Sequence, residues 1–105
     1  GNSRASEVGN ANMENYGGKI RKRITRRFKV PAAARRDRVS GTATVRFTLT
    51  SNGNLTGVSL ASSSGSSAID EAAIDAVRRA APFPAFPAGA PSSESFIVPM
   101  VASVR

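Results

Sequence analysis

The sequence predicts an α+β domain of two layers, in which a three-stranded antiparallel sheet carries two main helices on one face. Three observations support this fold class. Residues 41–50 alternate strictly between apolar and polar side chains and run into an Asn-Gly pair, which is typical of a β-hairpin. Residues 67–81 have apolar side chains at helical spacing. Residues 96–104 alternate again, so a third strand follows this helix.

The composition is that of one small domain. The chain has 105 residues, a net charge of +8, no cysteine and no histidine. This composition excludes disulfides, thiol chemistry and the usual zinc sites, and we expect no cofactor. Residues 1–12 are small and polar without an apolar period. We therefore expect them to form a flexible linker, so that the domain comprises residues 13–105.

The first helix is predicted from an apolar stripe. Its apolar side chains recur every three or four residues: Met13, Tyr16, Ile20, Ile24 and Phe28. Lysine and arginine occupy most of the other positions from Lys19 onward. The dipeptide Val30-Pro31 ends the helix, since a residue before proline avoids helical backbone. Proline at a first helical position can then begin a short second turn over Ala32–Arg38.

The first strand has apolar side chains at alternate positions: Ala43, Val45, Phe47 and Leu49. A two-residue turn at Asn52-Gly53 would place Phe47 opposite Val58. The same register places Val45 opposite Leu60. Because the apolar side chains of both strands then share one face, the pattern supports this pairing.

The second main helix carries its own boundary signals. Ser67 is placed to cap the first turn with its hydroxyl, and Asp70 follows three residues later, as in a capping box. Pro82 excludes continuation of the helix. One face is apolar and made mostly of small residues: Ile69, Ala73, Ala76, Val77 and Ala80. Such a face allows the helix to lie close against the sheet as the crossover between the second and last strands.

The last strand contains a proline, which indicates an edge position. Pro99 has no N–H to donate, so it fits an edge strand with its nitrogen pointing outward. The backbone groups of Ile97, Val101 and Ser103 then face the free edge, while the even-numbered residues pair with the first strand. The crossover helix returns the chain antiparallel to the first strand. The predicted strand order is therefore second-first-last.

Several short motifs occur in an order that resembles a known family. They are Val30-Pro31-Ala32-Ala33-Ala34-Arg35, Gly41-Thr42-Ala43-Thr44-Val45-Arg46-Phe47, Asn52-Gly53, Ser63-Ser64-Gly65, Asp70-Glu71-Ala72-Ala73, Ala81-Pro82-Phe83-Pro84 and Phe96-Ile97-Val98-Pro99-Met100. As an ordered set over residues 16–105, they resemble the C-terminal domain of TonB-family energy transducers.

This resemblance implies a periplasmic domain of a longer protein that an N-terminal helix anchors in the inner membrane. Members of the family transmit proton-motive energy from an inner-membrane motor complex to outer-membrane receptors. Those receptors import iron chelates, haem or similar nutrients. The domain binds a short receptor segment, the TonB box, as an added strand. No enzymatic activity is implied.

Two groups of residues are candidates for partner binding. The first is the last strand, because an unpaired edge accepts an added peptide strand: Ile97, Val98, Pro99, Met100, Val101, Ala102, Ser103 and Val104. The second precedes the Val30-Pro31 dipeptide, where the resemblance implies contacts with the partner peptide in some members: Arg27, Phe28 and Lys29.

Three alternatives stay open. A related adaptor of the same fold, of the TolA type, would act on other partners in the cell envelope. The clustered cations of the first helix would suit a basic nucleic-acid-binding module that contacts phosphates, although the sequence shows no motif for specific nucleic-acid recognition. A second copy of the chain could occupy the free edge instead and form a homodimer.

Overall fold

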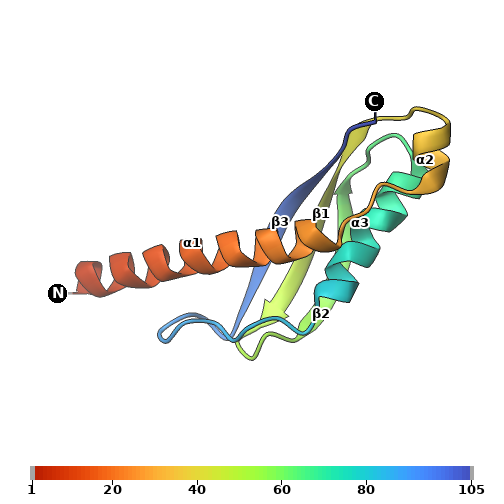
Figure 1. Ribbon diagram of the computed structural model, residues 1–105. Coiled ribbons are helices and arrows are strands. Elements are labelled where there is room, and N and C mark those ends of the chain that lie inside the picture. The colour runs from red at the N-terminus through yellow and green to blue at the C-terminus, as the bar shows by residue number, and fades with distance from the viewer. Residues whose placement is uncertain (1, 105) are drawn as a thin grey trace.

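The computed structural model describes the backbone of residues 2–104 and the side chains of residues 13–104. The elements follow one another as α1 (Asn2–Arg27), α2 (Ala32–Arg36), β1 (Gly41–Thr50), β2 (Leu55–Ser62), α3 (Ser67–Ala80) and β3 (Ser93–Ala102). The strands form one antiparallel sheet in the order β2-β1-β3 (Figure 1). The predicted fold class and strand order are therefore confirmed.

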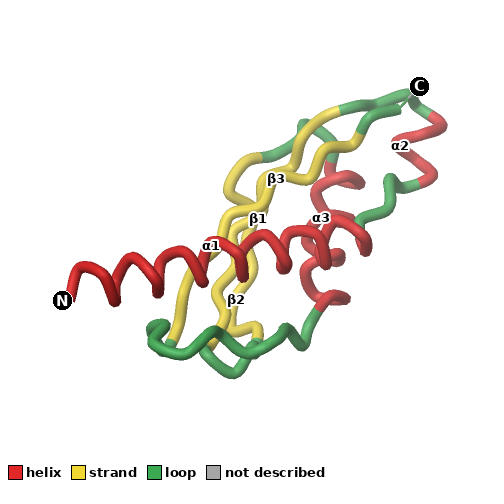
Figure 2. Tube along the Cα trace, turned by 60° about the vertical axis from the view of Figure 1, so that its left-hand side comes forward, coloured by secondary structure: helices red, strands yellow, loops and turns green. Residues whose placement is uncertain are grey.

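Both long helices cover the same face of the sheet, as predicted (Figure 2). The helix α3 packs on β1 and β2, while α1 packs against α3 and β3. Between the layers lies one apolar core, made of Tyr16, Ile20, Ile24, Ala34, Ala43, Val45, Phe47, Leu49, Ile69, Ala73, Ala76, Val77, Ala80, Phe83, Val98, Met100 and Ala102. In the described part of the chain no helix covers the opposite face, so one face of the sheet is open to solvent.

The helix α1 is longer than the sequence predicted. It begins at Asn2, so residues 2–12 are helical where we expected a linker without secondary structure. A domain boundary at residue 13 stays a prediction. Tyr16, Ile20 and Ile24 are buried, as the apolar stripe predicted. Across the described residues, no helix combines the length and the apolar character that crossing a membrane requires.

The short helix α2 also differs from its predicted bounds. It ends at Arg36, two residues before the predicted end. Pro31 is its N-cap residue, with extended backbone, and not its first helical residue. Arg38 follows with a φ of 54°, a left-handed conformation that does not continue a helix.

The hairpin of β1 and β2 has the predicted register. Phe47 lies opposite Val58, and Val45 lies opposite Leu60. Two irregularities interrupt the pairing, because β2 has extra residues at Thr56 and Ala61 that have no partner in β1. The apolar alternation of β1 carries no sign of either irregularity, and we did not predict them.

The turn of the hairpin is held by the segment that follows α3. Gly53 has a φ of 88°, and a side chain there would collide with the carbonyl of Phe83. The N–H of Phe83 donates to the carbonyl of Gly53 at 3.0 Å. A glycine is therefore required by both the turn conformation and the close approach of this segment.

The N-terminus of α3 is capped by a different serine from the one expected. The Oγ atom of Ser66 accepts a hydrogen bond from the N–H of Ile69 at 3.3 Å. The prediction that Ser67 caps the helix is wrong, because Ser67 is already its first residue. The predicted apolar face is confirmed, since its members are all buried: Ile69, Ala73, Ala76, Val77 and Ala80.

Asp70 accepts hydrogen bonds from the loop between β2 and α3 and does not form the predicted capping box. Its Oδ1 atom accepts from the N–H of Ser64 at 2.8 Å and from the Oγ of Ser64 at 2.7 Å. Its Oδ2 atom accepts from the Oγ of Ser63. Burial acts to raise the pKa of Asp70, but these hydrogen bonds outweigh it and hold the pKa below its ordinary value.

The aromatic part of the core is centred on Phe47. Its ring stacks on Phe83 and Phe96, with centroids 6.0 and 5.5 Å away. Phe83 is buried, although the sequence analysis did not place it in the core. Phe28, the last residue of the predicted apolar stripe, and Phe96 are only half-buried and pack at the margin of the core.

Candidate functional site

The strand β3 forms one edge of the sheet, with β1 as its single neighbour. Ten consecutive pairs join the two strands, from Gly41 opposite Ala102 to Thr50 opposite Ser93. No irregularity interrupts this pairing. The edge strand is therefore regular along its whole length, which is what a further strand needs for pairing.

The hydrogen bonds at the end of β1 show which way its backbone groups point. The N–H of Thr50 donates to the carbonyl of Asn54 at 2.9 Å, and the carbonyl of Thr50 accepts from Gly53 at 2.8 Å. Both groups of Thr50 thus point toward β2. The N–H of Ser51 instead donates to the carbonyl of Ser92 at 2.8 Å, on the β3 side. Because directions alternate along a strand, the odd-numbered residues of β1 face β3.

This alternation determines the free groups of β3. Val45 and Ala43 face β3, so their partners Val98 and Met100 point their backbone groups inward. Pro99 lies opposite Thr44, which faces β2. The nitrogen of Pro99 therefore lies on the free side of the strand, where the missing N–H removes no bond within the sheet.

The free groups extend further than the sequence analysis proposed. By the same alternation, the outward-facing residues of β3 are Ser93, Ser95, Ile97, Pro99 and Val101. We had begun the site at Ile97 and missed the two serines. Their alternation with Glu94 and Phe96 was the available signal, but Ser93 and Ser95 are polar and so did not stand out from the preceding loop.

Side chains on the outer face give this edge an apolar surface. Ile97 is 49% exposed and Val101 is 67% exposed, and they are the exposed large hydrophobic residues of the described chain. Pro99 lies between them and is exposed as well. Val98, Met100 and Ala102 point into the core. Exposed apolar side chains beside a free strand edge are typical of a peptide-binding surface.

The last two residues proposed for this site do not belong to the strand. The strand β3 ends at Ala102, and Ser103 and Val104 lie beyond it. The N–H of Val104 donates to the Oγ of Ser40 at 3.0 Å. This N–H is therefore already bonded within the chain, and the regular edge ends before Ser103.

The second proposed group, Arg27, Phe28 and Lys29, lies on the helix side of the sheet. Arg27 and Lys29 line a small hollow of about 170 Å³ together with α3 residues, among them Asp75 and Arg79. Phe28 packs against the core. The lining of this hollow contains no residue of β3, so the structure does not bring the two proposed groups together in one site.

Comparisons with known proteins agree with this architecture. The profile of the family described as Gram-negative bacterial TonB protein C-terminal matches residues 26–101. Two relatives, each described as Protein TonB, come from Pasteurella multocida (strain Pm70) and Haemophilus influenzae (strain ATCC 51907 / DSM 11121 / KW20 / Rd). Each is 35% identical over 80 residues, or 76% of this chain. The chain spans only 31% and 30% of their lengths.

The fold is similar to the NMR solution structure of the Helicobacter pylori TonB-CTD. The TM-score is 0.75, with 22% identity, and the match covers 87% of this chain and 82% of that chain. At this identity the likeness concerns the fold alone. The family profile and the two relatives support the assignment at the level of sequence. The chain therefore belongs to the family of Gram-negative bacterial TonB protein C-terminal domains.

Proposed function

We propose that this domain binds the TonB box of outer-membrane receptors as a strand added to the free edge of β3. Through this joint it would transmit proton-motive energy for the uptake of iron chelates, haem or similar nutrients. The observation that supports the proposal most is the regular, unpaired edge with Ile97 and Val101 exposed beside it. Membership of the TonB family is the second support.

The strength of such a joint follows from its backbone bonds. The five outward-facing residues of β3 offer four N–H groups and five carbonyls, because Pro99 has no N–H. Each hydrogen bond that a peptide makes to them contributes about 0.5–1.5 kcal/mol net. Ordering a flexible peptide opposes this gain, so we expect moderate affinity. A pull along the strands loads all of these bonds at once. The joint would thus resist force while staying reversible.

The role of the longer protein rests on the family resemblance. Since the chain spans about a third of its relatives, we propose that the remainder includes an N-terminal helix in the inner membrane. That part would contact the proton-channel motor complex. The domain itself would then lie in the periplasm. The proposed role consists of binding and force transmission and includes no chemical step.

A proline substitution tests the proposed edge. Val101→Pro removes an outward N–H and leaves the bonds to β1 in place. We expect a folded domain whose affinity for TonB box peptides falls about tenfold, measured by titrating the labelled domain with receptor peptides. A scrambled peptide is the control for non-specific binding. Equal affinity of Val101→Pro and the parent domain would contradict strand addition at this edge.

A second copy of the chain is the competing occupant of the same edge. Strand addition between two copies would make a homodimer through β3 and would block the peptide. Sedimentation of the domain with and without receptor peptide distinguishes the two. We expect the peptide to bind the monomer, and a dimer that persists at saturating peptide would place the peptide elsewhere.

A further inference from the structure

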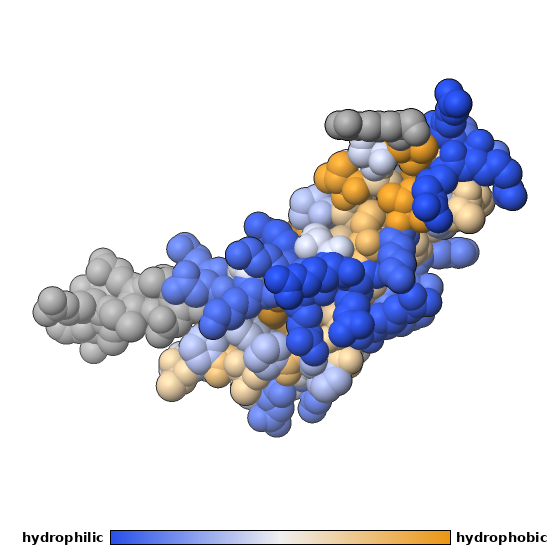
Figure 3. Space-filling view, in the orientation of Figure 1, coloured by the Kyte–Doolittle hydropathy of each residue, from blue (hydrophilic) through white to orange (hydrophobic). Residues whose placement is uncertain are grey.

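A second surface with an unusual charge lies on α1, away from the edge of β3. A hollow of about 500 Å³ is lined by Lys19, Lys22, Arg23, Arg26, Arg27 and Pro84. Five of these six residues are cations and none is acidic. In Figure 3 a hydrophilic band follows the second half of α1 on this side of the molecule. The volume of the hollow is within the range of clefts that bind ligands, about 300–1,000 Å³.

The five cations gather on one side of α1 because of their spacing. Position 19, positions 22 and 23, and positions 26 and 27 come from successive turns, and the spacing of three or four residues between turns places them on one helix face. Arg21 lies on the other flank, in a hollow that also contains Glu14 and Glu94. Like charges three or four residues apart destabilise a helix. The helix dipole offsets part of this repulsion at Arg26 and Arg27, which lie in the last turn of α1, and an anion nearby would relieve more of it.

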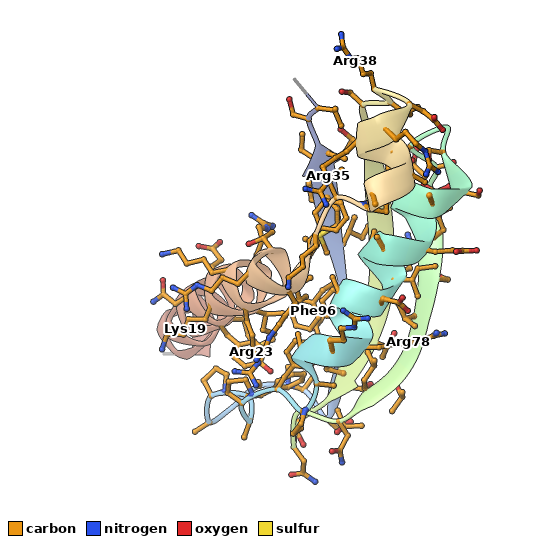
Figure 4. All side chains as sticks on the ribbon, turned by 45° about the vertical axis from the view of Figure 1, so that its right-hand side comes forward. Lys19, Arg23, Arg35, Arg38, Arg78 and Phe96 are labelled. Carbon is orange, nitrogen blue, oxygen red and sulfur yellow. The ribbon has the colours of Figure 1, made fainter. Side chains whose placement is uncertain are left out.

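Arg23 holds this face in place. Its Nε donates to the carbonyl of Ala80 at 2.8 Å, and its guanidinium also donates to the carbonyl of Pro82 at 3.1 Å. Figure 4 shows Arg23 between α1 and the segment after α3, whereas Arg38 points away at the far end of the molecule. Across residues 13–104 the one ion pair joins Arg36 and Asp37, so the cations of the hollow have no carboxylate partner there.

An adjoining hollow supplies an apolar wall. It has a volume of about 400 Å³ and is lined by Asn15, Tyr16, Lys19, Pro84, Ala85 and Pro87. The two hollows share Lys19 and Pro84, so they lie side by side along α1. The hydroxyl of Tyr16 donates to the carbonyl of Pro84 at 2.6 Å and holds the proline segment against the helix. Together they offer a row of cations beside a row of small apolar surfaces.

We propose that this groove binds an extended acidic peptide segment of a partner protein. Its carboxylates would pair with Lys22, Arg26 and their neighbours, and its apolar residues would lie on Pro84 and Pro87. Carboxylates form charge-assisted hydrogen bonds with such cations. The two adjoining hollows give an extended chain a concave surface along α1, whereas a lipid surface would match a convex patch. The aromatic ring in the linings of the two hollows is that of Tyr16, which is buried, so these linings offer nucleic-acid bases no exposed ring to stack on.

This inference does not depend on the function proposed for β3. The linings of the two hollows contain no residue of the sheet. A peptide could thus occupy the groove while another pairs with the edge. The variant Val101→Pro separates the two, because it should bind the receptor peptide about tenfold more weakly and bind an acidic peptide as the parent domain does.

The test uses a peptide of alternating glutamate and alanine, with a glutamine-alanine peptide as its neutral match. The double variant K22Q/R26Q removes two charges from the groove. Within residues 13–104, neither of these two side chains makes a hydrogen bond or an ion pair. The double variant R21Q/R46Q removes the same net charge from the other flank of α1 and from the outer face of the sheet. Affinity is measured by calorimetry at low and at high salt.

We expect the acidic peptide to bind the parent domain and to bind K22Q/R26Q about tenfold more weakly, with R21Q/R46Q within about twofold of the parent. The neutral peptide should not bind. An equal loss in both variants would overturn the proposal, because net charge alone would then explain the binding. Stronger binding to anionic vesicles or to a duplex DNA than to the peptide would overturn it too, in favour of lipid or nucleic acid.

Discussion

The two edges of the sheet differ in ways that bear on which of them accepts a partner. The edge strand β3 pairs with β1 through ten consecutive residues without irregularity. The edge strand β2 is shorter, and extra residues at Thr56 and Ala61 interrupt its pairing. Such irregularities bend and twist an edge, which discourages pairing with another chain. An open edge is therefore receptive only if it is also regular.

Contacts with other segments also hold the turn before β2 and the loop after it. Before β2, the hairpin turn is held by the bond between Gly53 and Phe83. After β2, Asp70 holds the loop through Ser63 and Ser64. The edge of β3 has instead the exposed side chains of Ile97 and Val101 beside its free backbone groups.

The largest expected effect contrasts two neighbouring positions of β3. Met100 is fully buried and its backbone faces β1, so Met100→Pro removes a bond of the sheet together with a core side chain. We expect a loss of about 4 kcal/mol or more, which is most of the free energy of unfolding of a marginally stable domain. Val101→Pro, the matched control, should lose no more than about 1 kcal/mol. Thermal melting of both variants checks this, and similar losses would mean that the outward direction assigned to Val101 is wrong.

The next prediction compares prolines on the two edges. Val58 lies opposite Phe47, whose backbone faces β3, so the N–H of Val58 points away from the sheet as that of Val101 does. We expect Val58→Pro to leave peptide affinity unchanged, at a cost in stability of about 1 kcal/mol from its half-buried side chain. Val101→Pro should lower affinity about tenfold. Titration of both folded variants with one receptor peptide measures the two affinities. A loss of affinity in Val58→Pro would place the binding site on β2.

A smaller effect is expected from restoring the missing donor of the β3 edge. Pro99→Val adds an N–H on the free side without touching the bonds to β1. One further hydrogen bond to a peptide would raise affinity about twofold to tenfold, equivalent to about 0.5–1.5 kcal/mol. The same variant should associate more readily with itself, because proline on an edge limits such pairing. Peptide titration and sedimentation measure the two effects, and an unchanged affinity would place the peptide away from Pro99.

The smallest effect on stability is expected from Asp70, which holds the loop after β2. The pKa of Asp70 is lower in the folded state than in the unfolded state, so its contribution is present above the unfolded pKa and is lost as pH falls through the folded pKa. Because solvent screens this group, we expect Asp70→Asn to cost about 0.5 kcal/mol at neutral pH. Chemical unfolding at neutral and acid pH checks this. A difference between the two proteins that persists in strong acid would show that the charge of Asp70 is not the cause.

Much of the fold could be predicted because local patterns and packing agree. The hairpin register followed from the alternation of Val45 and Phe47 combined with the glycine turn at Gly53. The edge position of β3 followed from Pro99 alone. In each case a short stretch of sequence has one arrangement that buries its apolar side chains and satisfies its backbone.

Other features depend on contacts between distant residues and left no local signal. Ser66 and Ser67 are equally able to cap a helix, and only the folded chain shows that Ser66 has the extended backbone of an N-cap residue. Arg23 looks like its neighbouring cations in the sequence, yet it bonds to carbonyls 57 and 59 residues away. The site itself could be predicted only in part, since Ser103 and Val104 continue the alternation of β3 although the strand ends at Ala102.

The ring of Tyr16 is an intrinsic spectroscopic probe of the contact that its hydroxyl makes. Tyr16 is the single tyrosine of a chain without tryptophan, so its absorbance and fluorescence come from one place. That place is where α1 meets the proline segment, through the bond to the carbonyl of Pro84. Burial raises the pKa of Tyr16, so its stabilising effect is complete below the unfolded pKa and is lost as pH rises through the folded pKa. An alkaline titration followed by ultraviolet absorbance would thus record the ionisation of Tyr16, and with it the loss of the hydrogen bond that joins α1 to Pro84, without any added label.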